Sequence, residues 1–335
     1  MSVDPGKIAQ LVHDFGLEVM MAGYQAEPTV RERVFKIRPI SPSGSEWGWR
    51  ETVVVGDNIP TQIRTGEDAP KRVMQQGYVT YGAQKKWAQS MDIPEEIYKA
   101  ANAEQVIRKM VVDKVGPWAQ GFQVAKERQA AAIFNRGPIA AGDADVFDGS
   151  YLGPDGAVDP YPKFCYDGKP FFAASGNGHP LFLQSSVTKF NHVASNPLSA
   201  TTLESVRVAM MSTNAVDENN NPISVVPRTL LVPPGLTQTA EVLVGSVQQP
   251  GTAQNDINTN RGRFDVVQWR YLTDADGWFM GVAGQGVEFA DSGDPTLEVS
   301  TPDRNNGNVT MRMISYSGAW ATNWRMWYGN NIATS

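Results

Sequence analysis

One stretch of the chain, residues 94 to 138, constrains the fold most, because it predicts a single helix as long as a whole domain. Pro94-Glu95-Glu96 places a proline and two acids at its start, where the helix dipole favours them. Arg136-Gly137-Pro138 ends it with a cation, a glycine and a breaker. Seven apolar residues recur between these ends at helical spacing: Ile107, Val111, Val115, Trp118, Phe122, Ala125 and Ile133. At about 1.5 Å per residue, such a helix spans roughly 60 Å.

The other face of this helix is predicted to be polar. We place five charged residues on it: Lys109, Lys114, Lys126, Glu127 and Arg128. Pro117 lies inside the stretch, and a proline removes one helical hydrogen bond. We therefore expect a kink or a break near Val115-Gly116.

Before this helix, the sequence predicts a long β-hairpin with few residues for a core of its own. Glu51–Val55 is rich in β-branched residues, Val73–Met91 forms a second extended run, and Thr65–Pro70 is a polar tip between them. An isolated hairpin is marginally stable in water, so we expect it to lie on another surface. Residues 1 to 45 are predicted to be an extended arm with one short helix near Lys7–Phe15.

The second half of the chain predicts short helices among strands. Thr201 and Glu204 suggest a capping box, and Pro233-Pro234-Gly235 opens another helix after a buried strand at Thr229–Val232. Further strands are expected at Phe264–Leu272 and Gly277–Val282, with Asp276-Gly277 as a hairpin turn. A terminal strand is predicted from alternating residues: Trp320, Thr322, Trp324, Met326 and Tyr328. The mixture predicts an α+β fold with a long helix against sheet.

Charge and cysteine content limit the partners and the compartment. The formal net charge is -6 and the pI is about 5.2, which argues against a dedicated nucleic-acid binder. Cys165 is the one cysteine, so no disulfide can form within the chain, as suits a reducing compartment. Residues 1 to 18 lack the basic stretch and apolar core of a signal peptide, and no run approaches the roughly 18 apolar residues of a membrane span. We expect a soluble protein that does not bind a membrane.

The usual enzyme motifs are missing from the sequence. His13, His179 and His192 are the only histidines, and none shares a helical face with another metal ligand. Ser186-Val187-Thr188-Lys189 has the Ser-x-x-Lys spacing without its companion motifs. Three glycines, Gly281, Gly284 and Gly286, occur in the reverse order of a dinucleotide fingerprint. We therefore predict no catalytic, cofactor-binding or metal-binding residue, no cofactor, and no enzyme activity.

Two weaker possibilities concern ligand binding. Acids cluster at Asp143, Asp145, Asp148, Asp155 and Asp159, yet Phe147 and Pro154 stand where a calcium loop needs oxygen ligands. A solvated acidic loop is the favoured interpretation. Three tryptophans near the C-terminus, Trp320, Trp324 and Trp327, suit either carbohydrate stacking or a buried strand, and the second is favoured.

Several segments, in their order along the chain, carry a family resemblance. Tyr81-Gly82 with Lys86–Ile97 resembles the entry to the long helix in the major head subunits of Mu-like bacteriophages. Gly168–Phe172 with His179-Pro180-Leu181, and above all Pro227–Leu236, resemble later segments of that family. Gln248–Ala253, Asn255–Asn258 and Asp274–Met280 extend the likeness, which spans about residues 78 to 285. The inserted-looking Ala173–Gly178 departs from the family.

The resemblance implies the Hong Kong-type capsid fold and a major capsid protein of a tailed phage. It divides the chain into an N-terminal arm (1–45), an extended β-hairpin loop (46–92), a peripheral domain with the spine helix (93–195 and 290–335) and an axial domain (196–289). A cross-link between neighbouring subunits is also known in this fold. Lys71, Lys85 and Lys86 are candidates for it by position only.

The partners implied are first of all other copies of the chain. The subunit is expected to form hexamers and pentamers that contact neighbouring capsomers in the virion, and to be made in the host cytoplasm. Portal, scaffolding or decoration proteins, and weak non-specific contact with packaged double-stranded DNA, are further expectations. Two alternatives stay open: an encapsulin-like cellular compartment with the same fold, and a β-rich carbohydrate-binding protein that uses the terminal tryptophans.

Overall fold

The computed structural model describes residues 5–41, 48–55, 62–66, 68, 69, 71, 75–100, 102–138, 165, 167–249, 256–301, 303 and 307–332. Their helices are α1 (Pro5–Gln25), α2 (Arg31–Val34), α3 (Glu95–Lys99), α4 (Ala103–Asn135), α5 (Ala200–Val208) and α6 (Thr237–Gly245). A π-helical turn, Ala209–Thr213, extends α5, and 3-10 turns occupy Pro234–Leu236 and Trp324–Met326. In this part of the chain, no helix combines the length and apolarity needed to cross a membrane.

The strands belong to two five-stranded sheets and two small ribbons. The first sheet contains β1 (Lys36–Pro39), β11 (Val287–Asp291), β13 (Val309–Ala321), β12 (Thr296–Val299) and β4 (Lys85–Ile93). The second contains β7 (His192–Val193), β14 (Trp327–Asn330), β10 (Trp278–Gly281), β8 (Thr229–Val232) and β9 (Asp265–Gln268). The ribbons are β2 (Gly48–Val55) with β3 (Gln75–Ala83), and β5 (His179–Pro180) with β6 (Thr188–Lys189).

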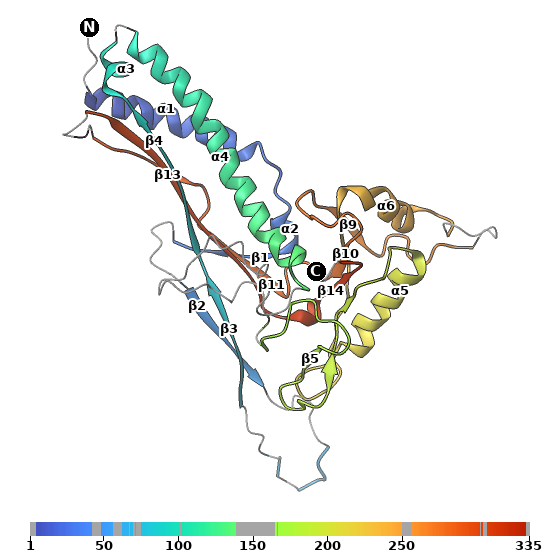
Figure 1. Ribbon diagram of the computed structural model, residues 1–335. Coiled ribbons are helices and arrows are strands. Elements are labelled where there is room, and N and C mark those ends of the chain that lie inside the picture. The colour runs from blue at the N-terminus through green and yellow to red at the C-terminus, as the bar shows by residue number, and fades with distance from the viewer. Residues whose placement is uncertain are drawn as a thin grey trace.

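The first lobe is the first sheet with α1 and α4 lying side by side over it (Figure 1). β13 is its long central strand, pairing antiparallel with β4 on one side and with β11 and β12 on the other. Between helices and sheet lies a core that includes Ile107, Val111, Val115, Met311 and Met313. The predicted apolar stripe of the long helix therefore faces a sheet, as expected.

The second lobe is the second sheet with α5 and α6, at the opposite end of the molecule (Figure 1). Its core includes Leu203 and Val206 from α5, Ala240 from α6, and Leu230 from β8. β8 is buried along its whole length, as its apolar sequence predicts. A third, aromatic core joins the two lobes where α4 ends, with Phe134 in edge contact with Trp327 and Phe279.

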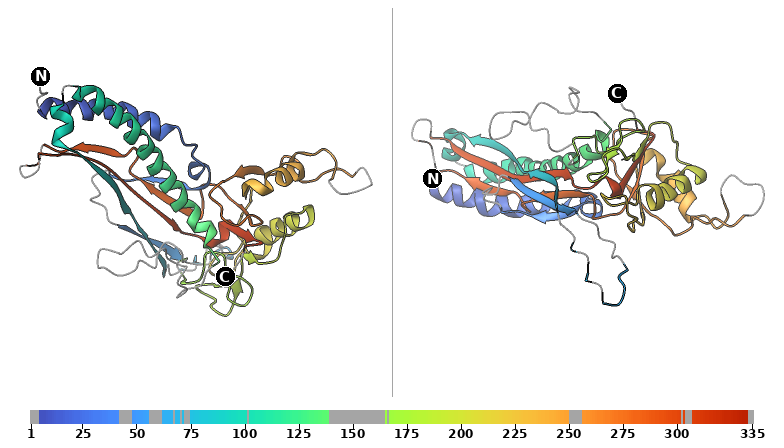
Figure 2. Two further views of the ribbon diagram at one scale, coloured as in Figure 1. Left: turned by 45° about the horizontal axis from the view of Figure 1, so that its top comes forward. Right: turned by 90° about the horizontal axis from the view of Figure 1, so that it is seen from below.

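The β2–β3 ribbon continues from the first sheet, where β3 contacts β13, and the described residues of its tip extend away from both lobes (Figure 2). It contains a bulge between Thr52 and Val54, and β3 continues through Gln84 into β4. The predicted extended run Val73–Met91 is thus divided: its first half pairs with β2 and its second half with β13. Only the first half belongs to the hairpin.

Two predictions about helices need correction. The N-terminal helix is not short, because α1 continues to Gln25 with Val12, Met20 and Tyr24 buried on one side. The long helix is two helices, and its break lies between Lys99 and Ala103 instead of at Pro117, which α4 contains. Packing of α4 against the sheet and α1 outweighs the loss of one hydrogen bond.

Three predictions in the second half also need correction. The capping box of α5 uses Ser199 and Thr202, not Thr201 and Glu204. Asp276-Gly277 is not a hairpin turn, because β9 and β10 lie on opposite sides of β8. The predicted terminal strand is interrupted after Ala321 by a 3-10 turn before β14 begins.

Candidate functional site

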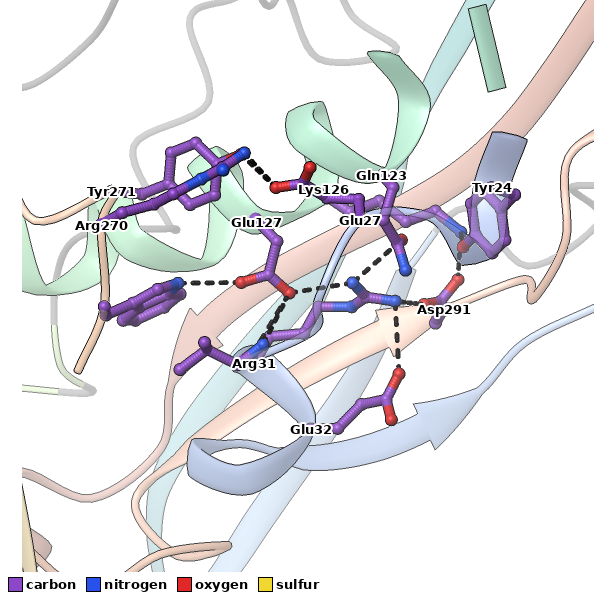
Figure 3. A network of polar contacts seen from close by, with 12 residues as sticks. Tyr24, Glu27, Arg31, Glu32, Gln123, Lys126, Glu127, Arg270, Tyr271 and Asp291 are labelled. Carbon is purple, nitrogen blue, oxygen red and sulfur yellow. Dashed lines mark hydrogen bonds and ion pairs between the residues drawn. The ribbon is translucent and has the colours of Figure 1, made fainter. Parts of the chain in front are cut away.

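A buried network of charged side chains lies where the N-terminal segment, α4 and the first sheet meet (Figure 3). Arg31 is at its centre, with 2 % of its surface exposed. Its guanidinium donates to Gln123 and Glu127 of α4 and to Asp291 of β11, each at 3.0 Å. Three elements distant in the sequence are thereby joined through one side chain.

Glu127 is fully buried and both of its carboxylate oxygens are used. One accepts from the backbone N–H groups of Val30 and Arg31, at the start of α2, as well as from the Arg31 guanidinium. The other accepts from the indole of Trp269 at 2.8 Å. This carboxylate therefore satisfies the first N–H groups of α2 while it balances the charge of Arg31.

Lys126 completes the network from the same turn of α4. Its ammonium donates to the Tyr24 hydroxyl at 2.8 Å, to Asp291 at 2.5 Å and to the Gly293 carbonyl at 2.6 Å. Burial lowers the pKa of Lys126 despite the attraction of Asp291, and burial with Asp291 nearby raises the pKa of the Tyr24 phenol. For Arg31, burial opposes the charge, but Asp291 and the other negative groups raise its pKa overall.

A neighbouring pair of contacts ties the end of the N-terminal segment to the chain that follows β9. Glu27 accepts from the guanidinium of Arg270 and from the Tyr271 hydroxyl, the latter at 2.8 Å. Asn135 at the end of α4 donates to the Tyr271 carbonyl and accepts from the Thr273 N–H. The segment 269–273 is thus held by α4 and by the N-terminal segment together.

These arrangements hold structure together and do not suit catalysis. The ionised groups are matched by partners of opposite charge or by hydrogen-bond donors, so none is left to act as nucleophile or base. Lys126 and Glu127 correct our sequence prediction, which placed both on the exposed face of the helix. The sequence did indicate that Lys126 is buried. It comes four residues after Phe122 and seven before Ile133, which places it in line with the apolar stripe.

The histidines show no metal site. His179 shares a 2.7 Å hydrogen bond with Asp167 and stacks on the Trp324 ring at 4.5 Å. His192 is buried in β7, where burial lowers its pKa, and His13 is exposed on α1. Across the described ranges, no three residues of the types that bind metals are grouped to hold an ion. The acidic cluster at 143–159 lies outside the described residues.

The other motifs singled out in the sequence are parts of the fold. Trp320, Trp324 and Trp327 are at most 2 % exposed, so stacking on a carbohydrate at the surface is ruled out and the buried interpretation is correct. Gly284 and Gly286 have positive φ in a turn that leads into β11. Ser186 and Lys189 lie at the β5–β6 ribbon, where Lys189 pairs with His179 across the two strands.

The three lysines considered for cross-linking lie in different settings. Lys71 is exposed at the hairpin tip, whereas Lys85 and Lys86 lie on β4 opposite Ser317 and Tyr316 of β13. Nothing in these positions selects one of them, so the cross-link stays a prediction.

The chain is similar to a phage capsid family and to several solved structures. The profile of the family described as phage capsid protein matches residues 166–330. A structure from Mycobacterium phage Patience aligns with 98% of this chain and 88% of its own, at 10% identity and a TM-score of 0.51. The capsid structure of the Cyanophage P-SCSP1u covers 92% and 89% (13% identity, TM-score 0.47), and the capsid of an empty GTA particle covers 93% and 96% (13%, 0.47). No curated protein matches the sequence.

The family profile matches 165 of the 335 residues, and the Patience structure supports the fold. The Patience structure confirms the predicted α+β fold. The matching profile is that of a structural capsid protein, not of an enzyme. The closer resemblance to Mu-like head subunits stays a prediction.

Proposed function

We propose that this chain is a phage capsid protein, and that its copies assemble as pentamers and hexamers into the icosahedral head that encloses a phage genome. The observation that supports this most is the β2–β3 hairpin, whose described tip residues extend away from both lobes. A two-stranded ribbon gains stability when its faces and edges are covered. In a shell, the adjacent subunit provides that cover.

The proposed division of labour follows the four segments predicted above. The first lobe supplies most of the peripheral domain, the second lobe supplies most of the axial domain, and the hairpin supplies the extended loop. β7 and β14 of the second lobe lie in the segments predicted as peripheral, and most of β4 of the first lobe lies in the segment predicted as the loop. Residues 1–45 were expected to be an extended arm, but α1 packs on α4 of its own chain. Contacts between subunits are therefore assigned to the hairpin and to the second lobe.

Further partners are part of the proposal. Portal, scaffolding or decoration proteins and packaged double-stranded DNA are the partners that a phage head needs, and synthesis in the host cytoplasm follows from that life cycle. The DNA contact is expected to be weak and non-specific, because the chain carries a net charge of -6.

The direct test is negative-stain electron microscopy of the purified protein. We expect closed polyhedral particles, or rings of five and six subunits. A population of monomers only, at concentrations where related shells assemble, would count against the proposed function.

A variant with a shortened hairpin tests whether the β2–β3 hairpin is needed for assembly. Deleting residues 66–70 and shortening β2 and β3 should leave a folded subunit, because the two lobes have their own cores. Assembly yield should fall at least tenfold, since many modest contacts add through multivalency. Circular dichroism checks the fold, sedimentation measures assembly, and particles of normal yield would contradict the role given to the hairpin.

A cellular nanocompartment of the same fold is the alternative, and the match to the phage capsid family makes it less favoured. Particle contents separate the two. Nuclease-resistant DNA in particles from infected cells supports a phage head, whereas a packaged enzyme supports a compartment.

A further inference from the structure

Two short segments of the described chain lead directly from one sheet to the other. Residues 282–286 connect β10 of the second sheet with β11 of the first, and residues 322–326 connect β13 of the first with β14 of the second. The two segments are hydrogen-bonded, for example from the Thr322 N–H to the Gly286 carbonyl at 2.9 Å. We call them the crossing. A change of backbone angle here would turn one lobe relative to the other.

An aromatic stack holds the crossing against the β5–β6 ribbon. Trp324 lies in the 3-10 turn of the crossing, and the His179 ring stacks on it with centroids 4.5 Å apart and planes 2° from parallel. Asp167 holds His179 in turn, because its carboxylate lies 2.7 Å from His179 Nδ1. The side chains of His179 and Asp167 are 0% and 2% exposed, so water does not compete for their hydrogen bond.

Arg325, the next residue of the crossing, is held by the second lobe. Its guanidinium lies 4.5 Å from the centroid of the Trp324 ring. Nη1 pairs with Glu218 at 2.8 Å, and Nε donates to the Val216 carbonyl at 2.6 Å. Because the side chains of Arg325 and Glu218 are largely buried, this charge-assisted contact has a defined geometry.

Five side chains therefore fasten the crossing to two separate loops, one that leads to β5 and one that follows α5. We call these five residues the clamp: Asp167, His179, Trp324, Arg325 and Glu218. The aromatic core around Phe134 also joins the lobes, but burial of apolar surface is non-directional. Ring stacking and hydrogen bonds depend on angle, so the clamp restricts rotation that the apolar core alone would permit.

We propose that the clamp sets the angle between the two lobes, and through that angle the curvature of the shell. The second part rests on the proposed function, in which the hairpin, continuous with the first sheet, and the second lobe both contact other copies. Copies close into rings only when each is turned by a fixed rotation relative to the next. A different angle between the lobes would be repeated at every copy and would change the size of the particle.

The angle is measured on the unassembled subunit with spin labels at Val112→Cys on α4 and Val208→Cys on α5. Both positions are 48% exposed, whereas the native Cys165 is buried. His179→Ala should widen the distribution of distances between the labels or shift its maximum. Asn258→Ala is the control, since it removes a buried side chain that bonds to the end of α6. It should leave the distribution unchanged, and an unchanged distribution in His179→Ala would overturn the proposal.

A conservative variant separates the stack from a general loss of packing. His179→Phe keeps a ring for Trp324 and should keep the narrow distribution, and a distribution as wide as that of His179→Ala would also count against the stack. If circular dichroism shows that His179→Ala is unfolded, Glu218→Ala takes its place. Its side chain is 12% exposed, and the loss of its pair with Arg325 should likewise widen the distribution. A narrow distribution in that variant would overturn the clamp.

Electron microscopy of assembled particles tests the second part. His179→Ala should shift the mean particle diameter or broaden the range of diameters relative to wild type. Identical particles from a variant whose distance distribution has changed would refute the link to curvature. Failure of the wild type to assemble would count against the proposed function alone, because the spin-label measurement uses the unassembled subunit.

Discussion

At the scale of single residues, Arg31 joins more of the molecule than any other side chain in the buried network. Replacing it with alanine leaves Glu127 and Asp291 buried with less compensation, and breaking a buried ion pair in this way costs about 3–5 kcal/mol. We expect Arg31→Ala to lower the free energy of unfolding, measured with urea on the unassembled subunit, by that amount. The control is Arg312→Ala, whose pair with Glu298 is about half exposed and contributes about 0–1 kcal/mol. Equal effects of the two variants would show that the network is not a special source of stability.

Because His192 is buried, we expect the free energy of unfolding of the subunit to depend on pH. Burial holds its pKa below the ordinary value of 6.5, so between the two values the unfolded chain binds a proton that the folded chain does not. The folded state therefore keeps its full stability above pH 6.5. As the pH falls toward the pKa of His192 in the folded chain, the free energy of unfolding decreases, with a slope of at most about 1.4 kcal/mol per pH unit. His192→Gln should flatten this part of the urea-stability profile, whereas His13→Gln, at an exposed position, should leave it unchanged. A profile that His192→Gln does not alter would contradict the assignment.

At the scale of elements, the approach of α1 to α4 depends on glycine. A Cβ on Gly23 would lie 2.4 Å from the carbonyl oxygen of Gly116, so the two helix backbones could not stay as close. We expect Gly23→Ala to destabilise the subunit by about 1–3 kcal/mol through overpacking, although alanine favours helix. Gly121→Ala on α4 is the matched control, because no atom lies within 4 Å of its Cβ. It should be neutral or stabilising by up to about 1 kcal/mol in thermal unfolding. If Gly23→Ala behaves as the control does, the helices are not in close contact there.

At the scale of the whole molecule, acidic charge limits contact with the genome. With a net charge of -6, the unassembled subunit should bind duplex DNA no more tightly than about 10⁻⁵ M at physiological salt. Gel-shift titration measures this, and repetition at low salt separates the electrostatic part. Tight binding at physiological salt would show a local basic surface that the overall charge hides.

The molecule consists of two lobes and a hairpin, and these parts differ in what they contribute. A continuous aromatic core around Phe134 joins the lobes, so the subunit is one folded body. The hairpin lies outside that core. Stability is therefore a property of the subunit, whereas the proposed function assigns the hairpin to contacts between subunits.

The sequence by itself determined what depends on neighbours along the chain. The apolar stripe of the long helix, the buried strand at Thr229–Val232 and the helix after Pro233-Pro234-Gly235 follow from local spacing and turn chemistry, and the ordered family segments predicted the capsid fold. Only the tertiary structure decided which strands pair and which charges are buried. β8 separates β9 from β10 despite the turn signal between them, and Lys126 and Glu127 lie inside because Arg31 and Asp291, distant in sequence, meet them there. Pairing and charge compensation depend on residues that come together only when the chain is folded, so no local pattern can predict them.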